Sequence, residues 1–196
     1  MNSIKDSLAE APVDYHILLS LETKVQGLPG IVEATNSLVQ KCLDEKWDRL
    51  WIVEADVEVP KHSLAKLLCD ADINLGIYPN HRPDELRMMA GYFQESYNQV
   101  KPEVKSVFDI NKLKGKIFTE MVWAGIGCAL IKRTVLQKIR FKYDLSEYFR
   151  KVGVHDQLFL FDAQQLGFQA LLHSDVICGH HPEWPLQKLE EQLNGC

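Results

Sequence analysis

Two acidic residues follow an apolar run in the first third of the chain, and their spacing suggests metal chemistry. Residues 50–53 read Leu-Trp-Ile-Val and lead directly into Glu54 and Asp56. Such a run predicts a buried strand that carries carboxylates to the edge of a sheet. Ligands of open α/β sheets bind outside the carboxyl ends of the strands. Because Mg²⁺ usually takes one or two protein carboxylates together with substrate phosphates, we expect a metal–diphosphate site on Glu54 and Asp56.

A solvated strand end is the alternative interpretation of these acids, and Glu58 adds a third carboxylate. A fully buried strand has little reason to end in clustered negative charge. Carboxylates that lie close together repel one another and are costly to desolvate, and a bound cation would relieve both effects. The apolar run before Glu54 therefore favours the metal site.

Three further groups of residues are candidates for chemistry. An apolar run ends at His180 and His181, whose imidazoles could bind Mn²⁺ or heavier ions, or simply be hydrogen-bonded in a loop. Asp156 lies at a predicted helix start, where it could act as a general base or interact with the helix dipole. Trp123 and Gly125 could form a platform that a sugar approaches closely, and a plain packing bend is the alternative interpretation.

The elements that must position these residues follow from apolar periodicity and from Pro and Gly. The spacing predicts a turn at 27–30, a helix that Pro60 opens, and antiparallel strands with irregular structure over 84–120. The other predicted elements are helices at 3–11, 31–46, 134–139, 155–166 and 185–193, and strands at 15–19, 49–54, 74–78 and 168–172.

The alternation of helix and strand in the first half predicts an α/β fold with a mostly parallel central sheet and helices on both faces. The 196 residues are enough for one domain with its own core. Within it, we expect a nucleotide-sugar-binding half at 1–83, an irregular acceptor-binding half at 84–184 and a C-terminal helix at 185–196.

Composition excludes several classes of function. The net charge of −5 provides no positive field for nucleic acid or an anionic membrane. The longest apolar stretch, 121–131, is too short for a transmembrane segment, and residues 1–11 lack the apolar core of a secretion signal. Five cysteines without a C-x-x-C pair argue against a zinc cluster and a secreted disulfide framework, although one bridge is possible. We therefore expect a soluble, cytoplasmic protein.

The order of the motifs resembles the GT-A glycosyltransferases of the inverting family 2 type, over roughly residues 30–184. That family has an apolar strand ending in Asp-x-Asp, a Gly-rich stretch before basic residues, an acidic pair at a helix start and a strand ending in Gly-His. The matching segments here are 52–60, 125–133, 155–156 with Phe159 and Gly167, and 179–180. The small size is also similar to that of a minimal GT-A transferase from a crenarchaeal virus.

The resemblance implies an N-terminally shortened GT-A fold and a transferase that uses a nucleoside-diphosphate sugar and a hydroxyl acceptor on a glycan, protein or lipid. Asp56 would bind Mn²⁺ or Mg²⁺ at the donor diphosphate, Glu54 would assist, and His180 would be a further ligand. Asp156 would activate the acceptor hydroxyl. The donor would also be contacted by Asn36, and by Trp123 and Gly125.

The sequence departs from the family pattern in ways that affect donor binding. Glu54 replaces the first Asp of the motif, and Thr35 stands where the family has an Arg before Asn36. The family's first strand has no counterpart, so the segment 15–22 or a partner would have to recognise the base. A sugar nucleotidylyltransferase would need a Gly-rich N-terminal phosphate loop, and a phosphatase would need Asp at position 54. The remaining alternative is a non-catalytic GT-A-like scaffold or carbohydrate-binding module.

Overall fold

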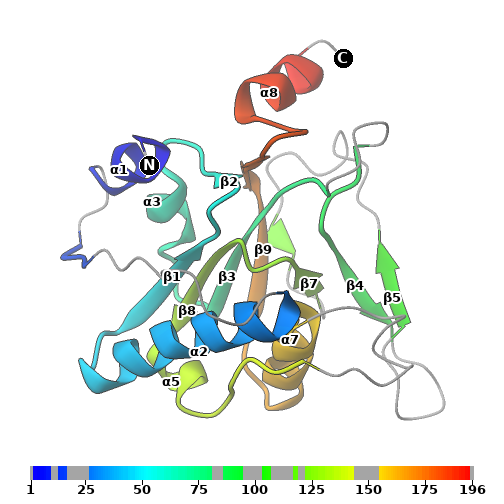
Figure 1. Ribbon diagram of the computed structural model, residues 1–196. Helices are drawn as coiled ribbons and strands as arrows, with labels where there is room; N and C mark the ends of the chain where they lie inside the picture. The colour runs from blue at the N-terminus through cyan, green and yellow to red at the C-terminus, as the bar shows by residue number, and fades with distance from the viewer. Residues whose placement is uncertain are drawn as a thin grey trace.

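The computed structural model of the chain describes residues 2–9, 13–16, 27–80, 86–94, 103–106, 117–118, 122–143 and 155–194 (Figure 1). Its helices are α1 (Asn2–Leu8), α2 (Leu28–Asp44), α3 (Ser63–Leu67), α5 (Arg133–Leu136), α7 (His155–Gln165) and α8 (Leu186–Asn194). Its strands are β1 (Arg49–Val53), β2 (Val57–Glu58), β3 (Ile73–Ile77), β4 (Ala90–Gln94), β5 (Glu103–Ser106), β6 (Ile117–Phe118), β7 (Val122–Ala124), β8 (Cys128–Lys132), β9 (Ala170–Ile177) and β10 (Gly179–His180).

The central sheet has five strands in the order β1-β8-β3-β9-β6. Only the β3–β9 pair is parallel among the described strands, and the other three pairings are antiparallel. The chain is therefore mixed α/β, and the prediction of a mostly parallel sheet is wrong for the described residues. The physical reason is β8, which lies between β1 and β3, runs in the opposite direction and is hydrogen-bonded to both.

The strand directions nevertheless put three carboxyl ends at one edge. Because β1 and β3 both run antiparallel to β8, and β9 runs parallel to β3, these three strands point the same way. Glu54 follows β1, Tyr78 follows β3 and His180 lies in β10 just after β9, while Gly127 immediately precedes β8. Side chains from distant parts of the sequence therefore meet at this edge.

Helices cover both faces of the sheet, as the sequence predicted. Alternation along β1 sends Leu50 and Ile52 to a cluster that also contains Phe159 of α7 and buried residues of α2. Trp51 and Val53 pack on the opposite cluster, which contains buried residues of α1 and α3. Figure 1 shows α2 lying across the face of the sheet to which Leu50 and Ile52 point. This two-sided burial explains why residues 50–53 are apolar without interruption.

Two smaller sheets complete the described structure. The order of the second sheet is β5-β4-β7, with antiparallel pairing throughout, which confirms antiparallel strands within 84–120 where that segment is described. The third is the β2–β10 ribbon, in which Val57 pairs with His180 and Glu58 pairs with Gly179. This ribbon lies directly after β1 and β9, and it carries residues 56–58 and 179–181 into one place.

The predicted turn at 27–30 is wrong, because α2 begins at Leu28 and includes Gly30. Pro29 lies in the first turn of the helix, where backbone N–H groups have no acceptor within the helix, so the missing N–H of proline costs no hydrogen bond. Its fixed φ also suits the helix. Gly27 has φ +74°, so the chain changes direction at this single residue before α2 begins. Residues 15 and 16 of the predicted strand 15–19 are described and form no strand, and residues 17–19 lie outside the described part.

The remaining helices and strands lie close to their predicted positions. The four described cysteines, Cys42, Cys69, Cys128 and Cys178, have free thiols, and Cys196 lies outside the described residues. None of the described helices is long and apolar enough to cross a membrane.

Candidate active site

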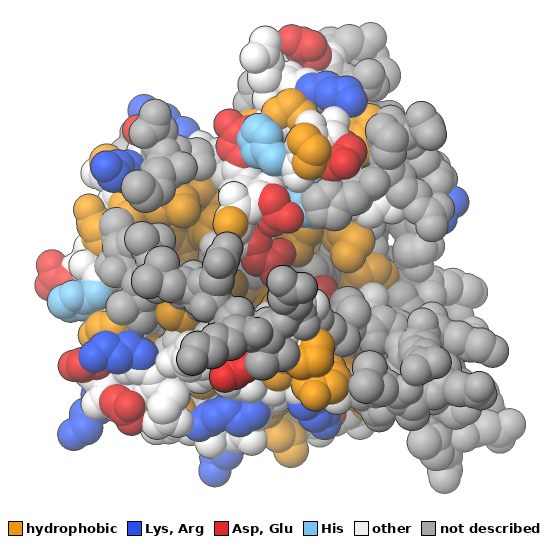
Figure 2. Space-filling model, viewed as in Figure 1, with side chains coloured by type: hydrophobic (Ala, Val, Ile, Leu, Met, Phe, Trp, Pro, Cys, Tyr) orange, Lys and Arg blue, Asp and Glu red, His pale blue; other side chains and the backbone are white. Residues whose placement is uncertain are grey.

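The acidic motif and the histidine pair meet at the β2–β10 ribbon. His180 is 6% exposed and Asp56 is 48% exposed, and the distance from His180 Nε2 to Asp56 Oδ2 is 3.5 Å. The backbone N–H of His181 donates to the Asp56 carbonyl at 2.8 Å, which fixes the two segments against each other. Figure 2 shows acidic and histidine side chains gathered on this face of the molecule, below α8. The structure thus brings together two of the three predicted metal ligands.

The orientation of His180 suits a metal ligand. Its Nδ1 lies 2.6 Å from the Pro79 carbonyl oxygen and donates its hydrogen there. A neutral ring then has its lone pair on Nε2, which lies 3.5 Å from Asp56 Oδ2, and a cation could bind to both atoms. A backbone carbonyl on the second ring nitrogen is the usual partner of a metal-bound histidine.

The donor set is small, since no group of three or more His, Cys, Asp or Glu side chains in the described residues is arranged to hold a metal. A carboxylate and an imidazole still fit Mn²⁺, and the carboxylate alone fits Mg²⁺, when phosphate oxygens complete the coordination, because few protein ligands are needed at diphosphate sites. The residues present therefore fit a cation that binds together with its substrate.

Glu54 lies against Gly127 and Tyr78. The Glu54 backbone N–H donates to the Gly127 carbonyl at 3.1 Å. The Gly127 N–H in turn donates to the Tyr78 hydroxyl at 3.0 Å. A Cβ added at Gly127 would lie 2.7 Å from Glu54 Oε2 and 2.8 Å from the Tyr78 hydroxyl, so a larger residue here would displace neighbouring side chains.

Tyr78 also explains Gly125, for which the sequence suggested a ligand contact. A Cβ at Gly125 would lie 2.0 Å from the Tyr78 hydroxyl oxygen. The glycine therefore permits the close approach of a tyrosine of the same chain, and a contact between Gly125 and the donor stays a prediction. Tyr78 was not predicted as a site residue from the sequence. Its position could have indicated it, because Tyr78 directly follows β3 just as Glu54 directly follows β1.

Asp156, the predicted general base, carries a buried carboxylate. It is 5% exposed at the first turn of α7, and its Oδ1 accepts the Gln157 N–H at 2.8 Å. Burial raises the pKa of Asp156 to about 6, although the backbone hydrogen bonds act in the opposite direction. Burial also raises the pKa of Tyr78 well above its usual value, and the charges of Glu54 and Asp156 add to that rise. The charges of Asp156 and Glu54 therefore both act on the hydroxyl group of Tyr78.

Buried polar atoms that have no hydrogen-bond partner among the described residues lie on both chain neighbours of Asp156 and on Trp123 of β7. They are Nε1 of Trp123, both ring nitrogens of His155 and Oε1 of Gln157. Burial lowers the pKa of His155 to about 4, so its ring is neutral near pH 7. Buried polar groups in native proteins are nearly always satisfied, by protein, water or ligand. These atoms could therefore bind the polar groups of a ligand.

Both polar atoms of the Asn36 side chain form hydrogen bonds within the protein. Its Nδ2 donates to the Phe141 carbonyl at 2.8 Å, and its Oδ1 accepts the Phe141 N–H at 3.0 Å. The amide ties α2 to the segment after α5, and its predicted contact with the donor stays a prediction.

Glu58 anchors α8 next to the site. Its Oε2 accepts the backbone N–H of Leu186 at 2.9 Å and lies 3.2 Å from His181 Nε2. The carboxylate satisfies one of the free N–H groups at the helix start and opposes the positive end of the helix dipole. The third acid of the motif is thus structural in this arrangement.

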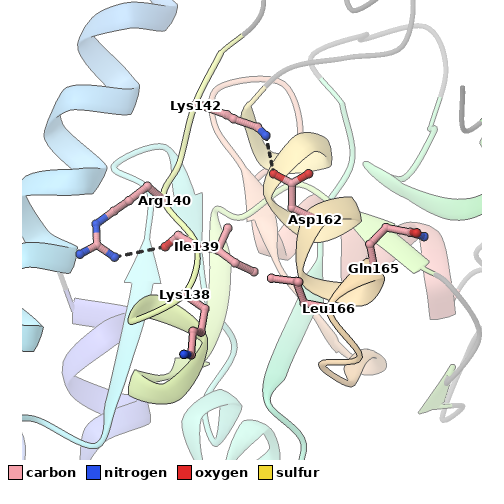
Figure 3. Close-up of a pocket in the computed structure, with 7 residues that line it drawn as sticks. All are labelled: Lys138, Ile139, Arg140, Lys142, Asp162, Gln165 and Leu166. Atoms are coloured by element: carbon pink, nitrogen blue, oxygen red, sulfur yellow. Dashed lines mark hydrogen bonds and ion pairs between the residues drawn. The ribbon is translucent and has the colours of Figure 1, made fainter. Parts of the chain in front are cut away.

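A cavity of about 510 Å³ lies elsewhere, beside the segment after α5 and the last turn of α7 (Figure 3). Lys142 forms an ion pair with Asp162 at 2.6 Å across it. The cavity is at the end of α7 opposite Asp156, and none of its lining residues belongs to the predicted site. Its lining residues are Lys138, Ile139, Arg140, Lys142, Asp162, Gln165 and Leu166.

Comparisons with known proteins bear on the fold alone. The sequence matches no protein-family model, and no curated protein matches it. Among solved structures, the chain is similar to the crystal structure of A197 from STIV, with a TM-score of 0.51 and 18% sequence identity. The match covers 78% of this chain and 68% of that one. At this identity the similarity supports a shared α/β arrangement.

Proposed function

We propose that this chain is a metal-dependent glycosyltransferase with a GT-A-like fold, which moves a sugar from a nucleoside-diphosphate donor to a hydroxyl acceptor. The observation that carries the proposal is the pair Asp56 and His180. An exposed carboxylate and an oriented imidazole lie 3.5 Å apart at the sheet edge where β1, β3 and β9 end. The charge of the buried Asp156 acts on Tyr78 and raises its pKa, and the Tyr78 ring lies 5.0 Å from the His180 ring, centroid to centroid.

Asp56 and His180 would hold the divalent cation, with the donor diphosphate completing its coordination. When bound, the cation would stabilise the negative charge that develops on the departing diphosphate. Glu54 stands next to Gly127, and its carboxylate would bind a donor hydroxyl. The Tyr78 hydroxyl accepts the Gly127 N–H, and this contact would keep the Gly125–Gly127 turn and Glu54 in position while the donor binds.

Asp156 would act as the general base. Its carboxylate would take the proton of the acceptor hydroxyl as the acceptor oxygen forms a bond to the anomeric carbon. The bond from that carbon to the diphosphate oxygen breaks with its electron pair, and a single displacement inverts the anomeric centre. A pKa of about 6 leaves Asp156 mostly ionised at pH 7 and makes it a stronger base than an exposed aspartate.

Isothermal titration calorimetry with nucleoside diphosphates tests the cation site. Wild type should bind one of these diphosphates with Mn²⁺ or Mg²⁺ and more weakly without metal. The variant Asp56→Asn should lose the dependence on metal because the neutral amide is a poorer ligand. Asp44→Asn, an exposed acid of α2, is the matched control and should bind as wild type does. Failure of every nucleoside diphosphate to bind wild type with either ion would contradict the proposal and favour a non-catalytic role.

A further inference from the structure

A second group of ligand-type side chains lies nearer the amino end of β3. Cys69 follows α3, Asn74 lies in β3 and His173 lies in β9. The distance from His173 Nε2 to Asn74 Oδ1 is 2.9 Å, from Cys69 Sγ to Asn74 Oδ1 is 2.7 Å, and from Cys69 Sγ to His173 Nε2 is 3.8 Å. One sulfur, one nitrogen and one oxygen from three segments thus converge on a single point.

The orientation of the asparagine directs its oxygen at the other two residues. Its Nδ2 donates to the Ala71 carbonyl at 3.3 Å, which leaves Oδ1 facing Cys69 and His173. In this arrangement Oδ1 accepts one hydrogen from the Cys69 thiol and one from Nε2 of His173. Both hydrogens lie inside the triangle of the three atoms. A cation placed there would replace the two hydrogens without any change of residue.

Two of the three residues are buried, and Cys69 is the most accessible of them. Asn74 is 0% exposed and His173 is 2% exposed, whereas Cys69 is partly exposed. Asn74 precedes Tyr78 by four residues of an extended strand, a separation of roughly 13 Å at ~3.3 Å per residue. The cluster is thus separate from the proposed active site and is not used by the proposed reaction.

We propose that Cys69, Asn74 and His173 form a zinc site. On binding, the Cys69 thiol would lose its proton to solvent and bind as thiolate. The hydrogen of His173 would reside on Nδ1, so that Nε2 offers its lone pair to the ion. Asn74 Oδ1 would be the third ligand, and a water entering past Cys69 would be the fourth.

The ligand types select the ion. Thiolate and imidazole favour Zn²⁺, whereas Mg²⁺ and Mn²⁺ prefer oxygen ligands of the kind present at Asp56. Tetrahedral zinc with bonds of ~2.0–2.3 Å places its ligand atoms about 3.3–3.6 Å apart. The distance of 3.8 Å from Cys69 Sγ to His173 Nε2 is slightly longer than this range, while Asn74 Oδ1, at 2.7 Å and 2.9 Å from the other two atoms, must withdraw by less than about an ångström. Because Cys69 lies in the loop between α3 and β3, the sulfur can also move outward.

A zinc ion here would join the α3–β3 loop to two neighbouring strands. Zn²⁺ that binds only the folded chain stabilises it by mass action. We therefore expect thermal unfolding to shift upward with Zn²⁺ concentration, and about one proton to be released per ion because the thiol must ionise.

Titration of the metal-free full chain with Co²⁺ and Zn²⁺ tests the site. Wild type should bind one Co²⁺ with a thiolate-to-metal charge-transfer band, which Zn²⁺ displaces. Cys69→Ser should remove that band, and His173→Gln should weaken binding at least tenfold, with circular dichroism confirming that both variants fold. Cys42→Ala, in α2, should bind as wild type does.

The same titration on Asp56→Asn separates this inference from the proposed function. The band should persist in that variant, because the two sites share no ligand. Absence of a charge-transfer band in folded wild type would overturn the zinc site. So would a band of wild-type strength in Cys69→Ser, since the sulfur ligand would then be another cysteine. Neither result would affect binding of a nucleoside diphosphate.

Discussion

The β2–β10 ribbon and the first turn of α7 present their carboxylates in opposite ways. Asp56 on the ribbon is 48% exposed and lies beside an imidazole, whereas Asp156 on the helix is 5% exposed and receives backbone N–H groups. Burial gives Asp156 a pKa of about 6. An exposed carboxylate can take up a hydrated cation, and a buried one can hold or release a proton near neutral pH. The difference indicates that environment, more than residue type, separates the two proposed roles.

The largest expected effect is that of Asp156→Asn on turnover. An amide cannot accept the acceptor proton, so the rate of sugar transfer should fall by about 10²–10⁴, the usual contribution of a general base. Metal-dependent binding of the nucleoside diphosphate should not change, because the donor site keeps Asp56 and His180. Asp162→Asn, on the same helix, is the control and should keep wild-type rates. A transfer rate within twofold of wild type would remove Asp156 from the mechanism.

The same substitution should stabilise the protein. The folded state binds the Asp156 proton more tightly than the unfolded chain, with a pKa of about 6 against 3.8. This residue therefore lowers stability as pH rises from about 4 to about 6, and the loss is complete above that range. Each pKa unit corresponds to about 1.4 kcal/mol, so Asp156→Asn should raise the free energy of unfolding at pH 7 by up to about 3 kcal/mol.

Chemical denaturation at pH 7 and below pH 4 measures that difference, and the gain should vanish at the lower pH. Asp56→Asn is the contrasting variant, since the loss of an exposed carboxylate should change stability by less than about 0.5 kcal/mol. Equal effects of the two substitutions at pH 7 would show that the contrast in burial has no energetic consequence.

Tyr78→Phe should have an intermediate effect. It leaves the Gly127 N–H buried without its acceptor at 3.0 Å, which costs about 1–3 kcal/mol of stability. Because that turn contacts Glu54, affinity for the donor should fall as well. Tyr143→Phe, at a side chain 41% exposed, should leave both quantities unchanged. Denaturation and calorimetry on the two variants provide the comparison, and identical results for both would mean that the Tyr78 hydroxyl positions nothing.

Glu58→Gln should give the smallest change. The neutral amide can still accept the Leu186 N–H but loses the charge that favours the start of α8, worth about 0.3–1 kcal/mol. Hydrogen exchange of α8 should become faster while exchange in β1 and β3 keeps its rate. If exchange slows or is unaltered in α8, Glu58 does not hold the helix.

The sequence predicted individual elements better than their assembly. The apolar run before Glu54 became β1, and α7 begins at His155 as expected. Strand pairing could not be predicted, because the pattern of a buried strand is the same for either direction. Nothing in residues 128–132 indicated that they would lie between β1 and β3 and run against them.

Two buried polar residues account for a further difference, in the length of one strand. The strand predicted at 168–172 extends to Ile177 because His173 and Ser174 are buried in β9 although their types suggest a loop. The His173 side chain is accommodated by its hydrogen bond with Asn74. Local sequence patterns do not indicate contacts between residues some hundred positions apart. For the same reason they did not predict the contacts of Tyr78 with Gly125 and Gly127, or the cluster of Cys69, Asn74 and His173.

Anomalous diffraction from a crystal soaked with Mn²⁺ and a nucleoside diphosphate that binds in solution tests the central claim most directly. We expect one manganese peak within bonding distance of the Asp56 carboxylate and His180 Nε2, with diphosphate oxygens on its open side. A bound diphosphate without manganese at these residues, or manganese bound elsewhere with the Asp56 side chain turned to solvent, would contradict the account.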